Sequence, residues 1–394
     1  MLFPVQPGWE RRYRDLGFDY VGQDDPPYWA DSVGYEFTRG ECDAIQAAAA
    51  ELHRMCLQAV DRIVAEPGLL ARYRLPPGFD DLVRRSWRRG DWTVCGRFDL
   101  ACAGGAVKLL EYNADSPGLL LESAVVQWSW FEARGLGRED KDQCNLLHEK
   151  LVASWRGFHR WKLPGGERLH LAFWDRSLED YRTCEYLADT ARQAGLEATL
   201  VPLARIGTDG DALLDPEDRR ITHLFMFYPL GWLFREAFAP VLLKDRCLLL
   251  EPPWKCLLSD KRILEILWEL FPGHRLLLEA TRDRPADPGG YMAKPYLGHG
   301  GAGVAVGSAA QPLHLAGAGA DGLVYQRRAD LPVFQALEGG PPRYLVVGAW
   351  VVGGEPAGIC CREDTVPVMT DRSPVVAHTC ADDRPATAPW PGRR

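Results

Sequence analysis

Hydrophobic residues recur at helical spacing in one long stretch near the start of the chain. Between residues 41 and 66 the apolar positions fall three or four residues apart, and Pro67 and Gly68 follow at once. This spacing predicts one amphipathic helix over 41–66 that ends at the Pro-Gly pair. Two further helices are predicted over 119–134 and 139–159.

The pattern changes near residue 168, where short apolar runs alternate with a helical segment. Three strands are predicted, and between the first two lies a helix over 177–195 that ends at Gly195; the strands cover 168–175, 197–203 and 221–230. This alternation is typical of a small parallel sheet covered by helices. Beyond it, the segment 259–274 predicts a helix with Ser259 or Asp260 as its cap.

The last third of the chain has mostly extended patterns. Residues 290–307 and 323–334 are predicted β structure, and 344–364 is a predicted hairpin of two apolar strands around Gly353 and Gly354. The Pro- and Arg-rich tail, 381–394, is expected to fray. The fold class is therefore α/β with α+β elements, and 394 residues favour two or three joined lobes.

Composition narrows the class of protein. The net charge of −8 argues against a duplex-DNA binder, which needs a basic stripe. The eleven cysteines are scattered without a C-x-x-C pair, so we expect reduced thiols in a reducing compartment. We find no apolar run of about 18 residues and no signal segment at the start, which predicts a cytoplasmic protein without a membrane span.

One hairpin, "GRFDLACAGGAVKLLEYNADSPG" at residues 96–118, combines charged and apolar residues. If its turn is centred on Gly105, Asp99 faces Glu111 and Arg97 faces Asn113, all on one side of the strands. Two opposed carboxylates repel each other unless a cation lies between them. Carboxylate and amide oxygens are ligands that Mg²⁺ prefers, often together with phosphates. The alternative is a solvated face with an Arg–Asp pair.

A glycine-rich stretch, "GHGGAG" at 298–303, matches G-x-G-x-x-G but is followed by strand and turn residues. A dinucleotide fold would need a helix there. A glycine hairpin that closes over phosphates fits better, because Lys294 precedes it and backbone N–H groups bind anions well. Lys261 opens an otherwise apolar helix. Together with the carboxylate hairpin, these lysines predict a site for a nucleoside triphosphate.

Several blocks resemble the glutathionylspermidine synthase family in its stand-alone synthetase form, which has an ATP-grasp fold and here no amidase domain. The matching stretches run in family order over about 9–380 and include the hairpin, "EPPWKCLLSDKRILEILWELFPGH", "YMAKP", "VYQRRADLP" and "VVGAWVVGGEPAGICCRED". The resemblance implies that ATP phosphorylates a substrate carboxylate and that an amine then attacks the acyl phosphate. The expected acid is a peptide or amino acid, and the expected amine is a polyamine or another amine.

The resemblance also implies a division of the chain. Residues 1–165 would hold the N-terminal helices and the metal-binding hairpin, which form part of the ATP-grasp core. Residues 166–255 would form an inserted, small βαβ lobe. Residues 256–380 would form the ATP-grasp lobe with the glycine loop and the C-terminal catalytic strands, followed by the tail.

Roles for individual residues follow from the matching positions. The resemblance implies that Mg²⁺ is bound by Asp99, Glu111 and Asn113. Arg97 and Arg362 match catalytic arginines. The ATP contacts would come from Lys261, Lys294, Gly298, Gly300, Gly301 and Gln326. Ser116, Glu179 and Asp180 match contacts to the acid substrate, the last two with its amino group.

Three positions depart from the family pattern. His299 and Gly303 stand where the loop usually has arginine and asparagine, and Gly118 stands where threonine or serine is usual. The Gly118 change removes one hydroxyl from the expected pocket for the acid substrate. It therefore argues against glutathione as that acid. The loop changes favour an alternative, a degenerate ATP-grasp protein that binds nucleotide and serves a partner. A ligase that modifies a carrier protein or a peptide natural product is a third reading.

Overall fold

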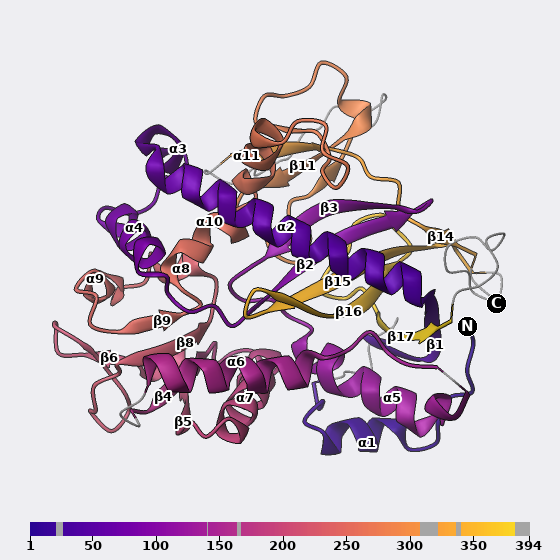
Figure 1. The fold of residues 1–394 in the computed structure, drawn as a ribbon, viewed down its shortest axis with the longest axis horizontal. Helices are drawn as coiled ribbons and strands as arrows, with labels where there is room; N and C mark the ends of the chain where they lie inside the picture. The colour runs from indigo at the N-terminus through magenta and orange to yellow at the C-terminus, as the bar shows by residue number, and fades with distance from the viewer. Residues whose placement is uncertain (21–26, 140, 164–166, 308–321, 336–339, 383–394) are drawn as a thin grey trace.

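A sheet of seven strands forms the centre of the computed structural model, which describes residues 1–20, 27–139, 141–163, 167–307, 322–335 and 340–382 (Figure 1). Its order is β1-β17-β16-β15-β2-β3, and β14 pairs with β15 beside this path. Only β1 and β17 pair in parallel; the other pairings are antiparallel. The strands are β1 (Trp29–Thr38), β2 (Cys95–Ala103), β3 (Ala106–Asn113), β14 (Val333–Phe334), β15 (Arg343–Val352), β16 (Glu355–Asp364) and β17 (Val375–Ala381).

The long helix α2 (Arg39–Ala65) covers one face of this sheet (Figure 1). It begins with a capping box, in which Thr38 accepts from the backbone N–H of Glu41 and the Glu41 side chain accepts from that of Thr38. Its apolar side packs on Phe98, Val347 and other core residues of the sheet. The prediction of a helix over 41–66 is thus confirmed, and the opposite face of the sheet is left for other elements.

A parallel sheet of four strands, in the order β5-β4-β8-β9, lies beside the central sheet. Its strands are β4 (Leu169–Phe173), β5 (Ala198–Pro202), β8 (His223–Phe227) and β9 (Leu248–Leu250). Helix α7 (Leu178–Gln193) connects β4 to β5, and Ser177 caps it by accepting from the N–H of Asp180. The predicted βαβ unit is present, with α7 one residue shorter at its start and two shorter at its end than the segment 177–195.

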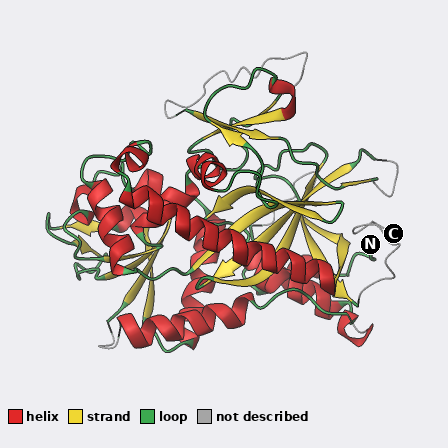
Figure 2. Cartoon of the chain, turned by 45° about the horizontal axis from the view of Figure 1, so that its top comes forward, coloured by secondary structure: helices red, strands yellow, loops and turns green. Residues whose placement is uncertain are grey.

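A third sheet of four strands carries the glycine-rich stretch. Its order is β10-β13-β11-β12, with β10 (Ala280–Thr281), β11 (Tyr291–Pro295), β12 (Ala305–Val306) and β13 (Leu323–Arg327). Figure 2 shows it standing over the central sheet. The predicted helix 259–274 is present as α11 (Arg262–Leu270), which is shorter at both ends, and a separate short helix, α10 (Cys256–Ser259), precedes it. The Asp260 side chain accepts from the N–H of Arg262 at the start of α11.

The remaining elements complete the layers. The predicted helix 119–134 contains a π-helical turn, Glu122–Val126, followed by α5 (Gln127–Ala133). The predicted helix 139–159 starts later, at Leu147. The other elements are α1 (Trp9–Asp15), α3 (Pro67–Ala71), α4 (Phe79–Arg89), α5 (Gln127–Ala133), α6 (Leu147–Lys162), α8 (Leu230–Leu233), α9 (Ala239–Leu242), β6 (Gly207–Thr208), β7 (Leu213–Leu214) and 3₁₀ turns at Leu136–Glu139, Leu203–Arg205, Pro253–Lys255 and Pro288–Gly290.

The mixture of parallel and antiparallel sheets confirms the α/β class with α+β elements. Among the described residues, no helix is long and apolar enough to cross a lipid bilayer. The expected fraying of the tail falls largely on residues 383–394, which lie outside the described part of the chain.

Candidate active site

The hairpin β2–β3 has the register expected at its charged end. Arg97 pairs with Asn113 and Asp99 pairs with Glu111. The turn, however, is a two-residue turn at Gly104 and Gly105, with φ of 57° and 79°. A bulge between Asp99 and Leu100 adds one residue to β3 and restores the expected pairing. The four polar side chains therefore share the face of the central sheet that lies away from α2.

Arg97 lies nearly buried in the middle of this face. Its Nε and Nη2 donate to the two carboxylate oxygens of Asp99, at 2.7 and 3.1 Å, and its Nη1 donates to the carbonyl of Gly118 at 2.5 Å. Burial opposes the charge of Arg97, but the Asp99 carboxylate outweighs it and raises the pKa of the guanidinium above its ordinary value. The head group is thus held as a fixed cation.

Gly348 makes room for this arginine. Gly348 lies on β15, between β2 and β16. It pairs with Asp99 on β2 and with Cys360 on β16. A Cβ at this position would lie 2.8 Å from Arg97 Cδ and 2.5 Å from Cys360 Sγ. Only glycine therefore fits between the two side chains.

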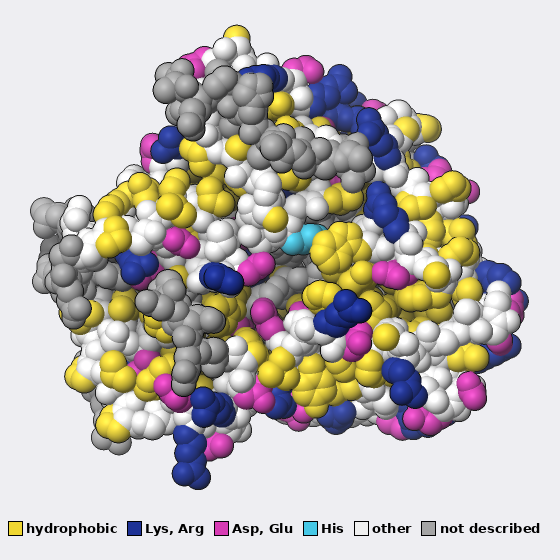
Figure 3. Space-filling view, turned by 180° about the vertical axis from the view of Figure 1, so that it is seen from behind, with side chains coloured by type: hydrophobic (Ala, Val, Ile, Leu, Met, Phe, Trp, Pro, Cys, Tyr) yellow, Lys and Arg dark blue, Asp and Glu magenta, His cyan; other side chains and the backbone are white. Residues whose placement is uncertain are grey.

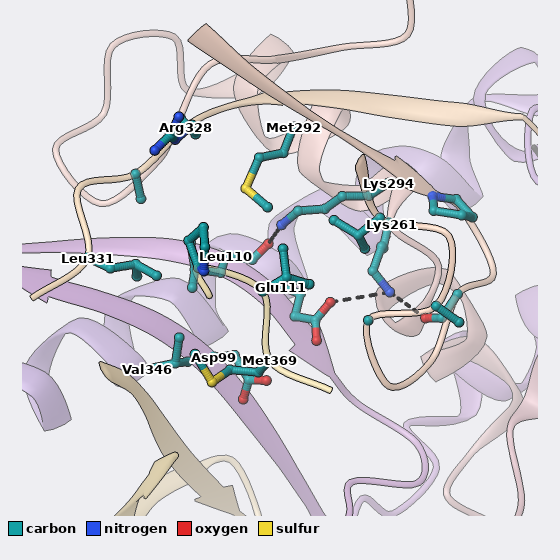
Figure 4. A pocket seen from close by; sticks show the side chains of 18 residues that line it. Asp99, Leu110, Glu111, Lys261, Met292, Lys294, Arg328, Leu331, Val346 and Met369 are labelled. Carbon is teal, nitrogen blue, oxygen red and sulfur yellow. Dashed lines mark hydrogen bonds and ion pairs between the residues drawn. The ribbon is translucent and has the colours of Figure 1, made fainter. Parts of the chain in front are cut away.

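Two lysines approach Glu111 from the other side of the pocket (Figure 4). Lys261 Nζ lies 3.3 Å from Glu111 Oε2 and donates to the carbonyl of Gly298 at 2.5 Å. Burial would raise the pKa of Glu111, but the ammonium groups of Lys261 and Lys294 outweigh it and lower that pKa to about 2. Glu111 is therefore ionised at every working pH.

Lys294 is fixed by a buried amide. Its Nζ donates to the carbonyl of Leu110 at 2.9 Å and to Gln326 Oε1 at 2.7 Å, while Gln326 Nε2 donates to the carbonyl of Leu109. Burial lowers the pKa of Lys294 to about 8, although Glu111 acts in the opposite direction. Gln326 is 2% exposed and does not line the pocket, so its side chain orients Lys294 from behind.

The pocket between these groups has a polar end and an apolar end. Asp99, Glu111, Lys261 and Lys294 line the first. Figure 4 shows the second, with Leu110, Leu331 and Val346 among its walls. Arg328, from the segment after β13, also lines it. A polar group of anions and cations beside an apolar slot suits a molecule with a phosphate chain and a flat ring. Sequence reasoning missed the apolar wall, because its members come from segments that lie far apart in the chain.

The glycine loop lies closed against the segment 367–371. A Cβ on Gly300 would lie 2.1 Å from Asp371 Oδ1, and one on Gly301 would lie 2.4 Å from the carbonyl oxygen of Met369. Gly298 and Gly301 line the pocket, and Gly300 does not. His299, which stands where an arginine was expected, meets the ring of Trp232 edge-on at 4.9 Å. The loop therefore contacts the small parallel lobe as well as the C-terminal segment.

A Gly301→Ala variant is expected to lose roughly tenfold or more in kcat/KM for ATP. Gly301 has a φ of 69°, which L-residues disfavour by about 1–2 kcal/mol, and its Cβ would meet backbone that cannot rotate aside. Gly273→Ala is the matched control, because Gly273 has a φ of 75° with nothing within 4 Å of the added Cβ. Steady-state kinetics of both variants make the comparison, and equal losses would contradict a role for loop closure.

The predicted acid-substrate residues lie at the other side of Arg97. A Cβ on Gly118 would be 3.1 Å from Glu179 Oε1, so the Glu179 carboxylate lies close against this glycine and a side chain there would crowd it. Burial, and then the charge of Glu122, raises the pKa of Glu179 to about 8. Burial also raises the pKa of Asp180 to about 6. Ser116 donates to Asp115.

Arg362 and Glu122 belong to the same region. Arg362 donates to the carbonyls of Thr370 and Ser373, and its Nε has no hydrogen-bond partner among the described residues. Glu122 is fully buried and accepts from the hydroxyls of Tyr20 and Tyr28. Sequence reasoning missed Glu122; its only signal was an acid within an apolar run, and that signal is weak.

The carboxylates fit a cation that also binds phosphate. Among the described residues, no three or more His, Cys, Asp or Glu side chains form a metal site on their own. Asp99 and Glu111 could supply two ligands to such a cation. Asn113 Nδ2 donates to Asp99 Oδ2 at 3.3 Å and to Glu111 Oε1 at 3.5 Å, so the amide would have to turn over to offer its oxygen as a third ligand. Mg²⁺ commonly completes such a set with water and phosphate oxygens. The pair fits that ion and not a protein-only metal site.

A comparison with protein families shows to which family the chain belongs. The family described as "Glutathionylspermidine synthase preATP-grasp" matches residues 1–381. The chain belongs to this family. The chain is 35% identical to a Haemophilus influenzae protein named "Putative acid--amine ligase". The match covers 95% of this chain and 98% of that protein.

Two longer members of the glutathionylspermidine synthase family are also similar. The "Bifunctional glutathionylspermidine synthetase/amidase" of Escherichia coli is 27% identical over 86% of this chain and 58% of its own length. The "Trypanothione synthetase" of Crithidia fasciculata is 25% identical over 84% of this chain and 54% of its own. The Haemophilus protein is named an acid–amine ligase and these two relatives are named synthetases, so family membership makes the protein an enzyme of the C–N bond-forming class.

A solved structure supports the fold. The glutathione synthetase-like effector of Globodera pallida, in its apo form, covers 95% of this chain and 99% of its own with a TM-score of 0.56 and 11% identity. At this identity the likeness concerns the fold alone. It places this member of the glutathionylspermidine synthase family in a glutathione synthetase-like architecture.

Proposed function

We propose that the protein is an ATP- and Mg²⁺-dependent carboxylate–amine ligase that works through an acyl phosphate. One observation carries the proposal: Asp99 and Glu111 face each other at the end of an apolar pocket, with Lys261 and Lys294 beside them and Arg97 next in line. Two acids, two lysines and an arginine around one point are the groups that hold and stabilise a transferring phosphoryl group.

In the proposed reaction, the apolar slot holds the adenine, and the lysines hold the phosphate chain. A carboxylate oxygen of the acid attacks the γ-phosphorus, the bond to the β-phosphate oxygen breaks, and ADP leaves. Arg97 and Arg362 stabilise charge on the phosphoryl oxygens. The amine then attacks the acyl carbon, loses a proton, and releases phosphate as the amide forms. Bound Mg²⁺ would be held by Asp99, Glu111 and Asn113 and would neutralise charge on the phosphates.

The closed glycine loop supports a water-sensitive intermediate. An acyl phosphate hydrolyses readily, so a lid over the phosphates protects it until the amine arrives. In the closed loop, Lys261 binds the Gly298 carbonyl and Gly301 lies against Met369. Both contacts link the lid to the polar end of the pocket.

The acid is proposed to be a peptide or amino acid whose amino group meets Glu179 and Asp180. The Glu179 carboxylate, close to Gly118 and near Arg97, suits an ammonium group of the acid substrate. The amine is proposed to be a polyamine or another amine, because the names of two longer relatives contain spermidine. The family pattern of threonine or serine is absent at Gly118, so the acid is expected to differ from glutathione.

Purified protein with ATP, Mg²⁺ and pooled acids and amines is expected to release ADP and phosphate. Chromatography of the nucleotides and a phosphate assay make the measurement, with each pool omitted in turn as a control. Formation of AMP and pyrophosphate would rule out the acyl phosphate. Mass spectrometry of products formed from a metabolite extract would then identify the acid and the amine.

A second candidate function is nucleotide binding without turnover. The observation that favours it is the loop sequence, in which His299 contacts Trp232 and Gly303 replaces a polar residue. Tight Mg·ATP binding in calorimetry, without ADP release for any pair of acid and amine, would support this candidate over the ligase.

A further inference from the structure

Helix α8 of the small parallel lobe is in contact with the glycine loop. Leu297, which leads into the loop, packs on the helix backbone: a Cβ added to Gly231 would lie 3.3 Å from Leu297 Cδ2. Next to this contact, the ring of His299 meets the ring of Trp232 edge-on, with 4.9 Å between the ring centroids. The loop and the helix therefore touch at two neighbouring positions.

His299 does not belong to the wall of the nucleotide pocket. Its neighbours Gly298, Gly301 and Ala302 line that pocket, and His299 does not. A histidine that offered its ring to a phosphate chain would be expected among the lining residues. In this structure the ring meets Trp232 instead. At the position where the family pattern has arginine, this chain thus has a residue that contacts the neighbouring lobe.

Trp232 is fixed within its own lobe. Its ring meets the ring of Tyr228 at 5.7 Å and 67°, and the Tyr228 hydroxyl donates to Glu236 at 2.8 Å. Leu230, the first residue of α8, donates its N–H to the buried carboxylate of Asp115 at 2.9 Å. The helix therefore offers the loop a surface that is held in place by contacts on both sides of Trp232 in the sequence.

The contact between the loop and α8 lies at the surface of the molecule. Trp232 is 42% exposed, although tryptophan side chains are highly buried on average. Figure 3 shows hydrophobic side chains grouped beside a histidine near the middle of the face opposite to that of Figure 1. A single exposed apolar side chain needs no explanation on its own. For Trp232, the ring contact with the loop supplies one.

We propose that Trp232 is a positioning residue, which keeps the glycine loop closed over the nucleotide pocket through its contact with His299. Lys261 on the Gly298 carbonyl and the Met369 carbonyl against Gly301 are the other contacts of the closed loop. Because one edge-to-face ring pair contributes only a small free energy, the contact can open and close in each binding cycle. The effect on ATP rests on the proposed function, whereas the effect on the loop does not.

The first test is hydrogen exchange of the ligand-free full chain, read by mass spectrometry on peptides that cover 298–304. The amides of Ala302 and Val304 are the reporters, since they donate to the carbonyls of His299 and Gly301 within the loop. Trp232→Ala is expected to speed their exchange roughly two- to tenfold, which corresponds to the loss of one ring pair. Trp232→Phe keeps a ring and is expected to restore most of the protection.

Two controls separate this contact from general damage to the lobe. Trp161→Ala removes another surface tryptophan, 72% exposed on α6, and is expected to leave loop exchange unchanged. His299→Ala is expected to speed loop exchange as Trp232→Ala does, and the double variant is expected to be no faster than either single variant. Peptides from β8 are expected to exchange as in the wild type throughout. Additive effects of the two substitutions, or wild-type loop exchange in Trp232→Ala, would overturn the proposal.

The second test is calorimetric binding of Mg²⁺ with a non-hydrolysable ATP analogue. Trp232→Ala is expected to weaken this binding by a similar factor, roughly two- to tenfold, mainly through faster dissociation. Trp232→Phe is expected to bind nearly as the wild type does. Unchanged affinity in Trp232→Ala, beside faster loop exchange, would overturn the statement that the contact keeps the loop over the nucleotide. Absence of binding in the wild type would instead contradict the proposed function.

Discussion

An Asp99→Asn variant is expected to lose turnover by a factor on the order of 10² to 10³ while keeping its fold. Asp99 has two roles in the proposed site. It holds Arg97 through two hydrogen bonds, and it faces Glu111 where the cation would bind. The asparagine has nearly the same shape but offers one oxygen and no charge. Arg97 would then lose its fixed orientation at the same time as the metal site loses a ligand.

The measurement for Asp99→Asn is the rate of ADP release, with the midpoint of thermal unfolding as a check on folding. Glu355→Gln is the control, since Glu355 lies on β16 in the same sheet but at its exposed end. Full activity in Asp99→Asn would remove this residue from the proposed metal site. An equal loss in both variants would point to the general charge of the sheet.

Binding of Mg·ATP is expected to weaken as the pH rises through about 8, because Lys294 then loses its proton. Burial lowers the pKa of Lys294 to about 8, so its ammonium is fully present below that pH and is lost above it. Glu111, with a pKa of about 2, does not change in this range. A charged hydrogen bond contributes about 1.5–3 kcal/mol, which corresponds to roughly a 10- to 150-fold change in affinity.

A Lys294→Gln variant is expected to bind Mg·ATP as weakly at low pH as the wild type does above pH 8. Its affinity is therefore expected to show no decrease near pH 8. Calorimetry in the absence of acid and amine makes the measurement, which avoids interference from Glu179, whose pKa is also about 8. Lys108→Gln is the matched control, because Lys108 lies on the same strand β3 and binds only the Leu277 carbonyl in the structure. A decline that persists in Lys294→Gln would assign the titration to another group.

The pairing of residues at the charged end of the hairpin was predictable from the sequence, although the turn on which the prediction was based is different in the structure. Counting from Gly105 places Asp99 opposite Glu111, and this pairing is correct. The turn uses Gly104 and Gly105 together, which shifts every pair by one residue until the bulge at Leu100 compensates. Alternation shows which residues share a face, but nothing in the local pattern shows a bulge. The strand that pairs with β2 was also beyond local patterns, because it lies more than 200 residues further along the chain.

Side-chain roles were harder to predict than positions. Gln326 was expected to contact ATP, yet its amide lies behind Lys294 and outside the pocket lining. Which way a side chain on β13 points depends on how that sheet stands over the central sheet. The start of α11 near Asp260 was predictable, because Ser259 and Asp260 are residue types that cap helices, but the buried ion pair between Asp260 and Arg262 was not. The domain limits and the catalytic roles stay predictions.

The order of strands in the central sheet has a consequence for synthesis of the protein. The hairpin β2–β3 is complete at Asn113, whereas its neighbour β15 begins at Arg343, 230 residues later. Until the ribosome has made β15, the nascent chain exposes β2 as an open edge, with Asp99 and Glu111 side by side and Gly348 not yet present. Open edges invite pairing with other chains. The proposed catalytic centre can therefore assemble only after β15 has been made, and until then the hairpin has an edge that other chains could pair with.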